Sequence, residues 1–214
     1  MPVKAVIFDM DGVILDSMRY HVRAWQKTFK PFNLDISDHE IYAREGESWL
    51  KSTYDFLKMA GIKPNRPLAE KVFQERGRIF KEIFRPKIFP GAKALLAMLS
   101  RKGFILALVT ATPKKDVKRM LPASMRNLFT VMVCGGDTMK GKPYPDPYLS
   151  ALEKIGINSS EAIVVENAPY GIASAKMAGI KCIAVKTSLE RKYLRGADII
   201  KDSLYEVAKY FMVH

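Results

Sequence analysis

The segment V-K-A-V-I-F-D-M-D-G-V-I-L-D-S, from Val3 to Ser17, decides the fold of this chain. The apolar run from Val3 to Phe8 is short and rich in β-branched residues, as is typical of a buried strand in a parallel sheet. Residues two apart in an extended chain point the same way, so Asp9 and Asp11 are predicted to face one pocket beyond the carboxyl end of the strand. Open α/β sheets bind their ligands at that edge.

Two carboxylates placed so close repel each other, so they need a cation, or one of them keeps its proton. A nucleophile, a metal and a general acid are together the equipment for phosphoryl transfer. The alternative is that D-x-D-G only turns the chain after the strand, since Asp and Gly favour turns. A lone D-x-D would favour the turn, and the flanking sequence changes that balance.

The string F-D-M-D-G-V-I-L-D-S resembles the first motif of the haloacid dehalogenase superfamily of phosphatases and phosphomutases, which carries it at the amino terminus. The resemblance implies that Asp9 attacks phosphorus and forms a phosphoaspartate. It implies that Asp11 protonates the leaving oxygen and then activates a water. It also implies Mg²⁺ between Asp9, the main-chain carbonyl of Asp11 and a fourth motif. An acid at Asp11 argues against the dehalogenase branch.

Composition limits the size of the core, the class of protein and the compartment that the chain suits. The 214 residues suffice for one medium-sized core and a small accessory domain. With 48% hydrophobic residues and charges of both signs mixed along the chain, a soluble globular protein is expected. The start M-P-V-K reaches Asp9 too early for a signal peptide or a membrane span. Cys134 and Cys182 form no C-x-x-C motif, which suits reduced thiols in the cytoplasm.

The formal net charge of +13 has two interpretations. It would attract anionic substrates or nucleic acid, or it is a solvated basic surface. The Lys and Arg residues are dispersed, and their densest group has the spacing of one exposed helix face: Lys114, Lys115, Lys118 and Arg119. We therefore favour the solvated surface, with no specific nucleic-acid partner and no membrane partner. No partner protein is indicated.

A helical pattern begins after Ser17, where Asp16 and Ser17 are good helix caps. Its apolar stripe recurs at three- and four-residue steps through Met18, Val22, Trp25 and Phe29. Further helices are predicted at residues 37–44, 48–60 and 68–83, with a break at 61–64. The haloacid dehalogenase family carries a small helical cap at this place.

His21 lies on the first of these helices. A lone helical His is more often a packing or surface residue than a catalyst. The string Y-H-x-x-A-W resembles β-phosphoglucomutase-like members of the family, and this resemblance implies that His21 faces the substrate.

The second motif follows a predicted strand at 104–109. Thr110 alone is an ordinary helix cap, but its distance from D-x-D matches the family's second motif. The resemblance implies that Thr110 and the Ala111 amide hold the transferring phosphoryl group. Thr112 is expected to cap the helix at 114–120 and to lie near the substrate.

The third and fourth motifs complete the set. A Lys before Pro usually marks a solvated loop, but K-P-x-P-x-x-Y, starting at Lys142, resembles the third motif, whose Lys neutralises the phosphorylated site. Glu166 and Asn167 follow a strand at 162–165, where oxygen ligands can hold Mg²⁺ or can simply turn the chain. Relatives often carry two acids there. An amide ligates without adding charge, so the resemblance implies Mg²⁺ but leaves its affinity open.

Strands alternating with helices predict an α/β fold, a doubly wound parallel sheet with a Rossmann-like core and a small all-α cap. The core is expected at residues 1–16 and 86–214 and the cap at 17–85. The remaining strands are predicted at 131–133, 181–185 and 198–200, and the remaining core helices at 91–102, 172–178 and 204–211. One further helix is predicted to begin at Pro145 or Pro147 and to end at Ile155.

The predicted function is Mg²⁺-dependent hydrolysis of a small phosphorylated metabolite, such as a sugar phosphate or a phosphoglycolate-like compound. Two alternatives stay open: a sugar phosphomutase, and a catalytically silent nucleic-acid-binding protein. β-Phosphoglucomutases carry K-G-x-S-R after the first cap helix, and aligning its Gly and Ser on Gly46 and Ser48 puts Glu45 at the Lys and Trp49 at the Arg. An acid would repel a distal phosphate. Arg44 is one residue away from the Lys position and is the candidate that would compensate, so Arg44 and Gly46 are expected to bind substrate.

Overall fold

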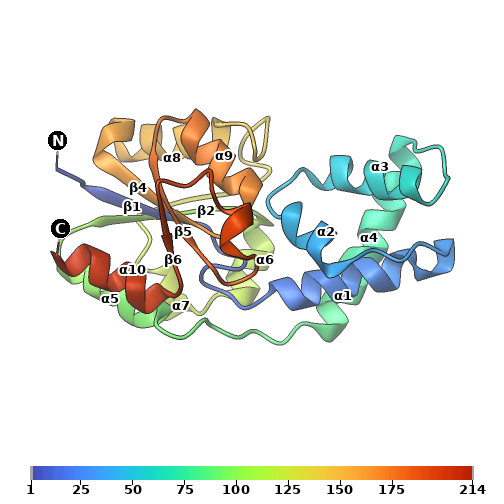
Figure 1. Cartoon of the computed structure of the whole chain (residues 1–214), viewed down its shortest axis with the longest axis horizontal. Coiled ribbons are helices and arrows are strands. Elements are labelled where there is room, and N and C mark those ends of the chain that lie inside the picture. Colours follow the sequence, from blue (N-terminus) through green and yellow to red (C-terminus); the bar gives the residue numbers. More distant parts are fainter. Residues whose placement is uncertain (1, 214) are drawn as a thin grey trace.

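The computed structural model describes residues 2–213 as a six-stranded parallel sheet joined to a bundle of four helices (Figure 1). The strand order is β3-β2-β1-β4-β5-β6. In this order β1, the strand that leads into the first motif, lies between β2 and β4. The strands are β1 (Ala5–Phe8), β2 (Ile105–Pro113), β3 (Val131–Gly135), β4 (Ala162–Glu166), β5 (Lys181–Val185) and β6 (Ile199–Lys201).

The predicted opening strand is the centre of the sheet. Ala5 is in register with Ile105 of β2 on one side and with Ala162 of β4 on the other. All four residues of β1 are buried, with exposed fractions of 1% or less, because helices cover both faces of a parallel sheet. Since all six strands run the same way, their carboxyl ends line one edge.

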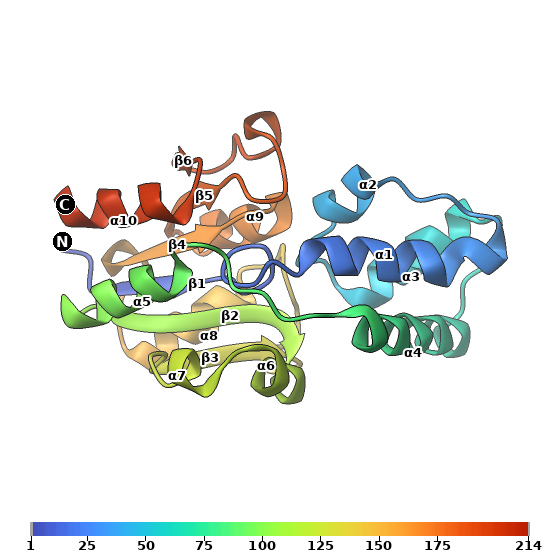
Figure 2. The ribbon, with the colours of Figure 1, turned by 90° about the horizontal axis from the view of Figure 1, so that it is seen from below.

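Two layers of helices cover the sheet (Figure 2). One apolar core joins it to α5 (Ala92–Arg101), α6 (Lys114–Met120), α7 (Ala123–Arg126) and α10 (Leu204–Val213). On the other face a second core joins it to α8 (Asp146–Ile155) and α9 (Pro169–Met177). The predicted doubly wound α/β fold is therefore confirmed.

The remaining helices form a separate unit beside the carboxyl edge (Figures 1 and 2). They are α1 (Met18–Phe29), α2 (Asp38–Ala43), α3 (Trp49–Met59) and α4 (Arg66–Ile83), with a core of their own around Trp25, Phe29 and Phe56. The predicted stripe of α1 is buried in this core. Leu15 and Ile88 pair where the chain leaves and re-enters the sheet unit. We propose the division at residues 16–17 and 85–86.

Several predicted element boundaries were wrong by a few residues. The helix α4 begins at Arg66 rather than at 68, because the Asn65 side chain accepts a hydrogen bond from the Leu68 amide and caps it. The helix α9 begins at Pro169 rather than at 172, since Pro fits the first helical turn. Strand β2 continues past Val109 to Pro113, with an irregular register.

Other predictions concern the surface. Lys114, Lys115, Lys118 and Arg119 are exposed, as expected for a solvated helix face. Cys134 and Cys182 are buried and carry free thiols. Within residues 2–213, the helices are all too short or too polar to cross a membrane.

Candidate active site

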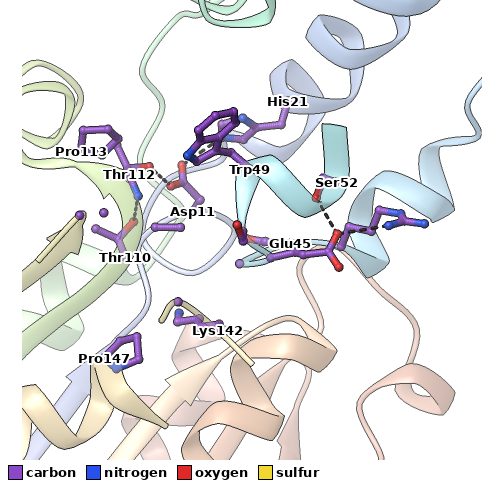
Figure 3. A pocket seen from close by; sticks show the side chains of 18 of the residues that line it. Asp11, His21, Glu45, Trp49, Ser52, Thr110, Thr112, Pro113, Lys142 and Pro147 are labelled. Atoms are coloured by element: carbon purple, nitrogen blue, oxygen red, sulfur yellow. Dashed lines mark hydrogen bonds and ion pairs between the residues drawn. The ribbon is translucent and has the colours of Figure 1, made fainter. Parts of the chain in front are cut away.

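The four sequence motifs meet at the carboxyl edge of the sheet, beside the helical unit. Figure 3 shows Asp11, Thr110 and Lys142 from the first three of them. Asp9 follows β1, Thr110 lies in β2 and Glu166 ends β4. Lys142 comes from the loop between β3 and α8. All four are buried, with exposed fractions of 5% or less. Polar groups so well buried need partners, and Asp9, Lys142 and Glu166 supply them to one another.

The ammonium of Lys142 lies between two carboxylates. Its Nζ donates to Asp9 Oδ1 and to Glu166 Oε1, both at 2.6 Å. Tyr148 also donates to Glu166 Oε1, at 2.9 Å, and the amide of Asn167 donates to Oε2. Glu166 is therefore held on both oxygens. The solvated-loop interpretation of Lys142 was wrong, since its exposed fraction is 4%.

The negative charges around Asp9 outweigh the single ammonium of Lys142. Burial raises its pKa, the Lys142 charge lowers it, and Glu166 and Asp11 raise it again, to about 8. The second oxygen, Asp9 Oδ2, is buried and without a hydrogen-bond partner among the described residues. A carboxylate in this state favours a proton or a cation.

Asp11 is held as an ionised carboxylate by neutral donors. Ser17 Oγ donates to Oδ1 at 2.6 Å and Thr112 Oγ1 donates to Oδ2 at 2.8 Å. Burial raises the pKa of Asp11, but the hydrogen bonds from His21, Ser17 and Thr112 bring it below its usual value. The predicted helix-capping roles of Ser17 and Thr112 were wrong, because both hydroxyls bond the buried carboxylate instead. Asp16, the other predicted cap, lies one residue before the Ser17 N-cap and forms ion pairs with Arg19 and Lys87.

His21 connects Asp11 to the helical unit. Its Nε2 is 3.4 Å from Asp11 Oδ1, and its Nδ1 contacts the guanidinium of Arg76 on α4. Since Arg only donates, Nδ1 accepts and Nε2 carries the proton. Burial and the Arg76 charge lower the pKa of His21, which keeps the ring neutral near pH 7. The ring of His21 stacks on Phe80, as the packing interpretation expects, but it also contacts Asp11, so packing is only part of its role.

The second motif forms the end of β2 beside these acids. Thr110 Oγ1 accepts a hydrogen bond from the Thr112 amide at 3.1 Å. A Cβ added to Gly135 of β3 would lie 2.0 Å from the carbonyl oxygen of Ala111, so only glycine lets the two strands approach here. Thr110, Ala111 and Thr112 all line the cavity described below. Their predicted contacts with a phosphoryl group stay predictions.

The metal-site prediction rests on Asp9, the Asp11 carbonyl, Glu166 and Asn167. Among the described residues, no three His, Cys, Asp or Glu side chains converge closely enough to hold a metal ion alone. Asn167 is fully buried, and its Oδ1 has no partner in that part of the chain. Orphaned buried oxygens on Asp9 and Asn167, in an acidic pocket, fit a hard cation such as Mg²⁺.

The loop from Arg44 to Trp49 brings the helical unit onto the site. Arg44 does not offer a free cation, because its guanidinium binds Glu40, Glu47 and Asp55 at 2.9–3.2 Å. Gly46 lies against Lys142, where an added Cβ would be 3.0 Å from its Cδ. Trp49 stacks on Phe73, with ring centroids 4.7 Å apart, as expected for packing within the cap.

A cavity of about 510 Å³ lies between the two units. Its core side includes Asp11, Thr110 and Lys142, and its cap side includes His21, Trp49 and Arg76. This volume suits a small metabolite. Arg76 was missed from the sequence, because an Arg on a long basic helix carries no local signal of where it points. The half-buried position of Glu45, whose carboxylate accepts from Asn167 Nδ2 at 2.7 Å, was also missed, because it depends on how the helical unit packs on the sheet unit.

Known proteins similar to this chain include phosphatases and a protein proposed to be a phosphomutase. A phosphatase of phosphorylated carbohydrates from Thermotoga maritima is 31% identical over 85% of this chain and 84% of its own length. The validoxylamine A 7'-phosphate phosphatase of Streptomyces hygroscopicus subsp. limoneus is 28% identical over 95% of each chain. A solved structure from Bacteroides vulgatus, proposed to be a β-phosphoglucomutase, has a TM-score of 0.88 and 31% identity, over 99% of this chain and 88% of its own.

The sequence profile of the haloacid dehalogenase-like hydrolases matches residues 6–185, a span that runs from the first strand to the end of β5 and includes the helical insertion. The resemblance noted from the motifs is therefore confirmed, and the chain belongs to the haloacid dehalogenase-like hydrolase family.

Proposed function

We propose that this protein hydrolyses a small phosphomonoester, of the sugar-phosphate or phosphorylated-polyol class, through a phosphoaspartate on Asp9. The observation that carries the proposal is the division of labour between two neighbouring acids. Asp9 contacts the Lys142 ammonium and keeps one oxygen free, whereas Asp11 is surrounded by hydroxyl and imidazole donors. Relatives named for phosphorylated carbohydrates support this substrate class.

The chain's own residues supply each step. The Asp9 carboxylate forms a bond to phosphorus as the bond to the ester oxygen breaks, and the leaving oxygen takes a proton that Asp11 carries. Asp11 then accepts a proton from water, whose oxygen attacks phosphorus and releases phosphate and Asp9. Lys142, Thr110 and the Ala111 amide hold the phosphoryl oxygens. Mg²⁺ held by Asp9, the Asp11 carbonyl and Asn167, with Glu166 adjoining, would supply positive charge to those oxygens.

Asp11 needs a proton that it lacks in the free site. Its carboxylate accepts three hydrogen bonds, which favours the ionised form. The arriving phosphoryl group is itself anionic and raises the pKa of a neighbouring acid. Substrate binding therefore favours protonation of Asp11, the proposed general acid, at a site that the helical unit shields from water.

A mutase is the second candidate, and one observation disfavours it. A bisphosphate intermediate needs a free cation on the cap for its distal phosphate. Arg44 is committed to three carboxylates, and Glu45 stands in the cap loop as an acid. Arg76 is a cap cation that lines the cavity, but its guanidinium contacts His21 beside Asp11. We expect phosphate release from monophosphates with Mg²⁺, and little interconversion of glucose 1-phosphate and glucose 6-phosphate even with a bisphosphate primer. Isomerisation much faster than phosphate release in a coupled assay would contradict this.

Substitution of Arg76 tests the contacts that run from Arg76 through His21 to Asp11. Replacing it with Met removes a cation beside His21 and Asp11, which raises the pKa of both groups. The pH profile of kcat for Arg76→Met is therefore expected to move to higher pH. Arg76→Lys keeps the charge and serves as the matched control, with a profile near that of the parent. If the pH profile of kcat for Arg76→Met matched that of the parent, Arg76 would have no part in the proton transfer at Asp11.

A further inference from the structure

A carboxylate from the helical unit reaches the metal-site edge of the sheet. Glu45 lies in the loop between α2 and α3, and its Oε2 accepts a hydrogen bond from Asn167 Nδ2 at 2.7 Å. The two residues are 122 positions apart in sequence and belong to different units. Figure 3 shows the Glu45 side chain between the segments that carry Asp11 and Lys142.

Three buried oxygens at this edge lack hydrogen-bond partners in the described part of the chain: Asp9 Oδ2, Glu45 Oε1 and Asn167 Oδ1. Buried acceptors without donors are rare in folded proteins and call for an explanation. Asp9 and Asn167 are more than nine-tenths buried, with exposed fractions of 5% and 0%. All three are carboxylate or amide oxygens, the ligand type that hard divalent cations take.

Glycine at position 12 lets these groups approach the first motif. A Cβ added to Gly12 would lie 2.0 Å from Asn167 Nδ2 and 3.0 Å from Glu45 Oε1. Both side chains thus lie against the backbone that follows Asp11, whose carbonyl is an expected ligand. A side chain at position 12 would displace either one.

Without a bound cation, this pocket holds more negative than positive charge. The carboxyl groups of Asp9, Asp11, Glu45 and Glu166 lie close enough to perturb one another, and Lys142 offsets only part of their charge. Asn167 brings an oxygen but no charge to this edge, and Glu45 adds a negative charge beside it from the opposite unit.

We propose that Glu45 is a cation ligand delivered by the helical unit, replacing the missing acid at position 167. Cation binding then joins the two units, because Glu45 and Asn167 belong to different ones. The inference rests on the proposed function only for the identity of the cation. Binding is measured without substrate, so its failure leaves the phosphatase proposal standing.

The test titrates the purified full chain with Mn²⁺, which takes the same oxygen ligands as Mg²⁺, and follows free Mn²⁺ by electron paramagnetic resonance. Glu45→Gln is expected to weaken binding about ten-fold or more. In an Asn167→Asp background the same change is expected to return affinity to within about three-fold of the parent, since the acid count is restored. Glu47→Gln is the matched control, because Glu47 lies on the same loop but binds Arg44, Lys51 and Ser52.

Thermal melting supplies a second readout. Without metal, Glu45→Gln is expected to melt no lower than the parent, because a Gln oxygen still accepts from Asn167 and one repelling charge is gone. Added Mg²⁺ is expected to raise the melting temperature of the parent more than that of Glu45→Gln. Mn²⁺ affinity within two-fold of the parent in Glu45→Gln would overturn the inference, as would a parent chain that binds no Mn²⁺.

Discussion

Asp9→Asn is expected to abolish turnover while raising the thermal stability of the metal-free protein. Loss of a covalent nucleophile lowers kcat by about three orders of magnitude or more. The stability gain has a different cause, since an uncharged amide relieves the repulsion that Glu166 and Asp11 exert on position 9. The Lys142–Glu166 pair, at 2.6 Å, stays intact.

The pH dependence of that gain can be derived from linkage. The pKa of Asp9 is about 8 in the folded protein and 3.8 in its reference state. The folded state therefore holds the proton more tightly, and the stability that Asp9 contributes below about pH 4 is lost as the pH rises toward 8. Asn at position 9 suffers no such loss. In the presence of a chelator, the difference in melting temperature between Asp9→Asn and the parent should grow from pH 5 to pH 8.

Two measurements decide this prediction. Phosphate release with Mg²⁺ reports turnover, and Asp35→Asn, an exposed acid in the helical unit, is the matched control for loss of one charge. Near-parental hydrolysis by Asp9→Asn would refute the phosphoaspartate mechanism. A gain in melting temperature that does not depend on pH would refute the charge explanation alone.

Lys142→Met should cause the largest loss of stability together with loss of activity. Removing the ammonium leaves Asp9 and Glu166 facing each other in a buried site, and breaking such a pair costs about 3–5 kcal/mol. For a chain of this size the melting temperature should fall by about 10 °C. Turnover should fall by about 10²–10³-fold, as when one charge-stabilising donor is lost.

A double variant separates these two effects. In Lys142→Met/Glu166→Gln, one of the two unpaired carboxylates is neutral, so part of the lost melting temperature should return. Activity should not return, because the phosphoryl group still lacks its ammonium. If the double variant melted as low as Lys142→Met, the buried charges would not be the source of the loss.

The parts of the site that could be predicted from sequence lie at strand ends. Asp9 follows an apolar run that is buried whatever the cap does, so its strand places it at the edge where ligands bind. Thr110 was placed by its match to the family's second motif, since alone it is typical of a helix cap. Ser17 and Thr112 were assigned to helix ends by a local rule, and that rule failed because a buried carboxylate competes for their hydroxyls. Glu45 and Arg76 could not be placed, since their positions depend on how one unit packs on the other.

The position of β1 at the centre of the sheet has a consequence for synthesis of the chain. This strand leaves the ribosome first, but its two neighbours begin at residues 105 and 162. Pairing it requires closure of two long loops, which slows folding. The helices between residues 18 and 83 pack on one another around a core of their own and can assemble meanwhile. The most apolar strand of the protein therefore remains unpaired while the helical unit assembles, and overexpression without chaperones should trap it in aggregates.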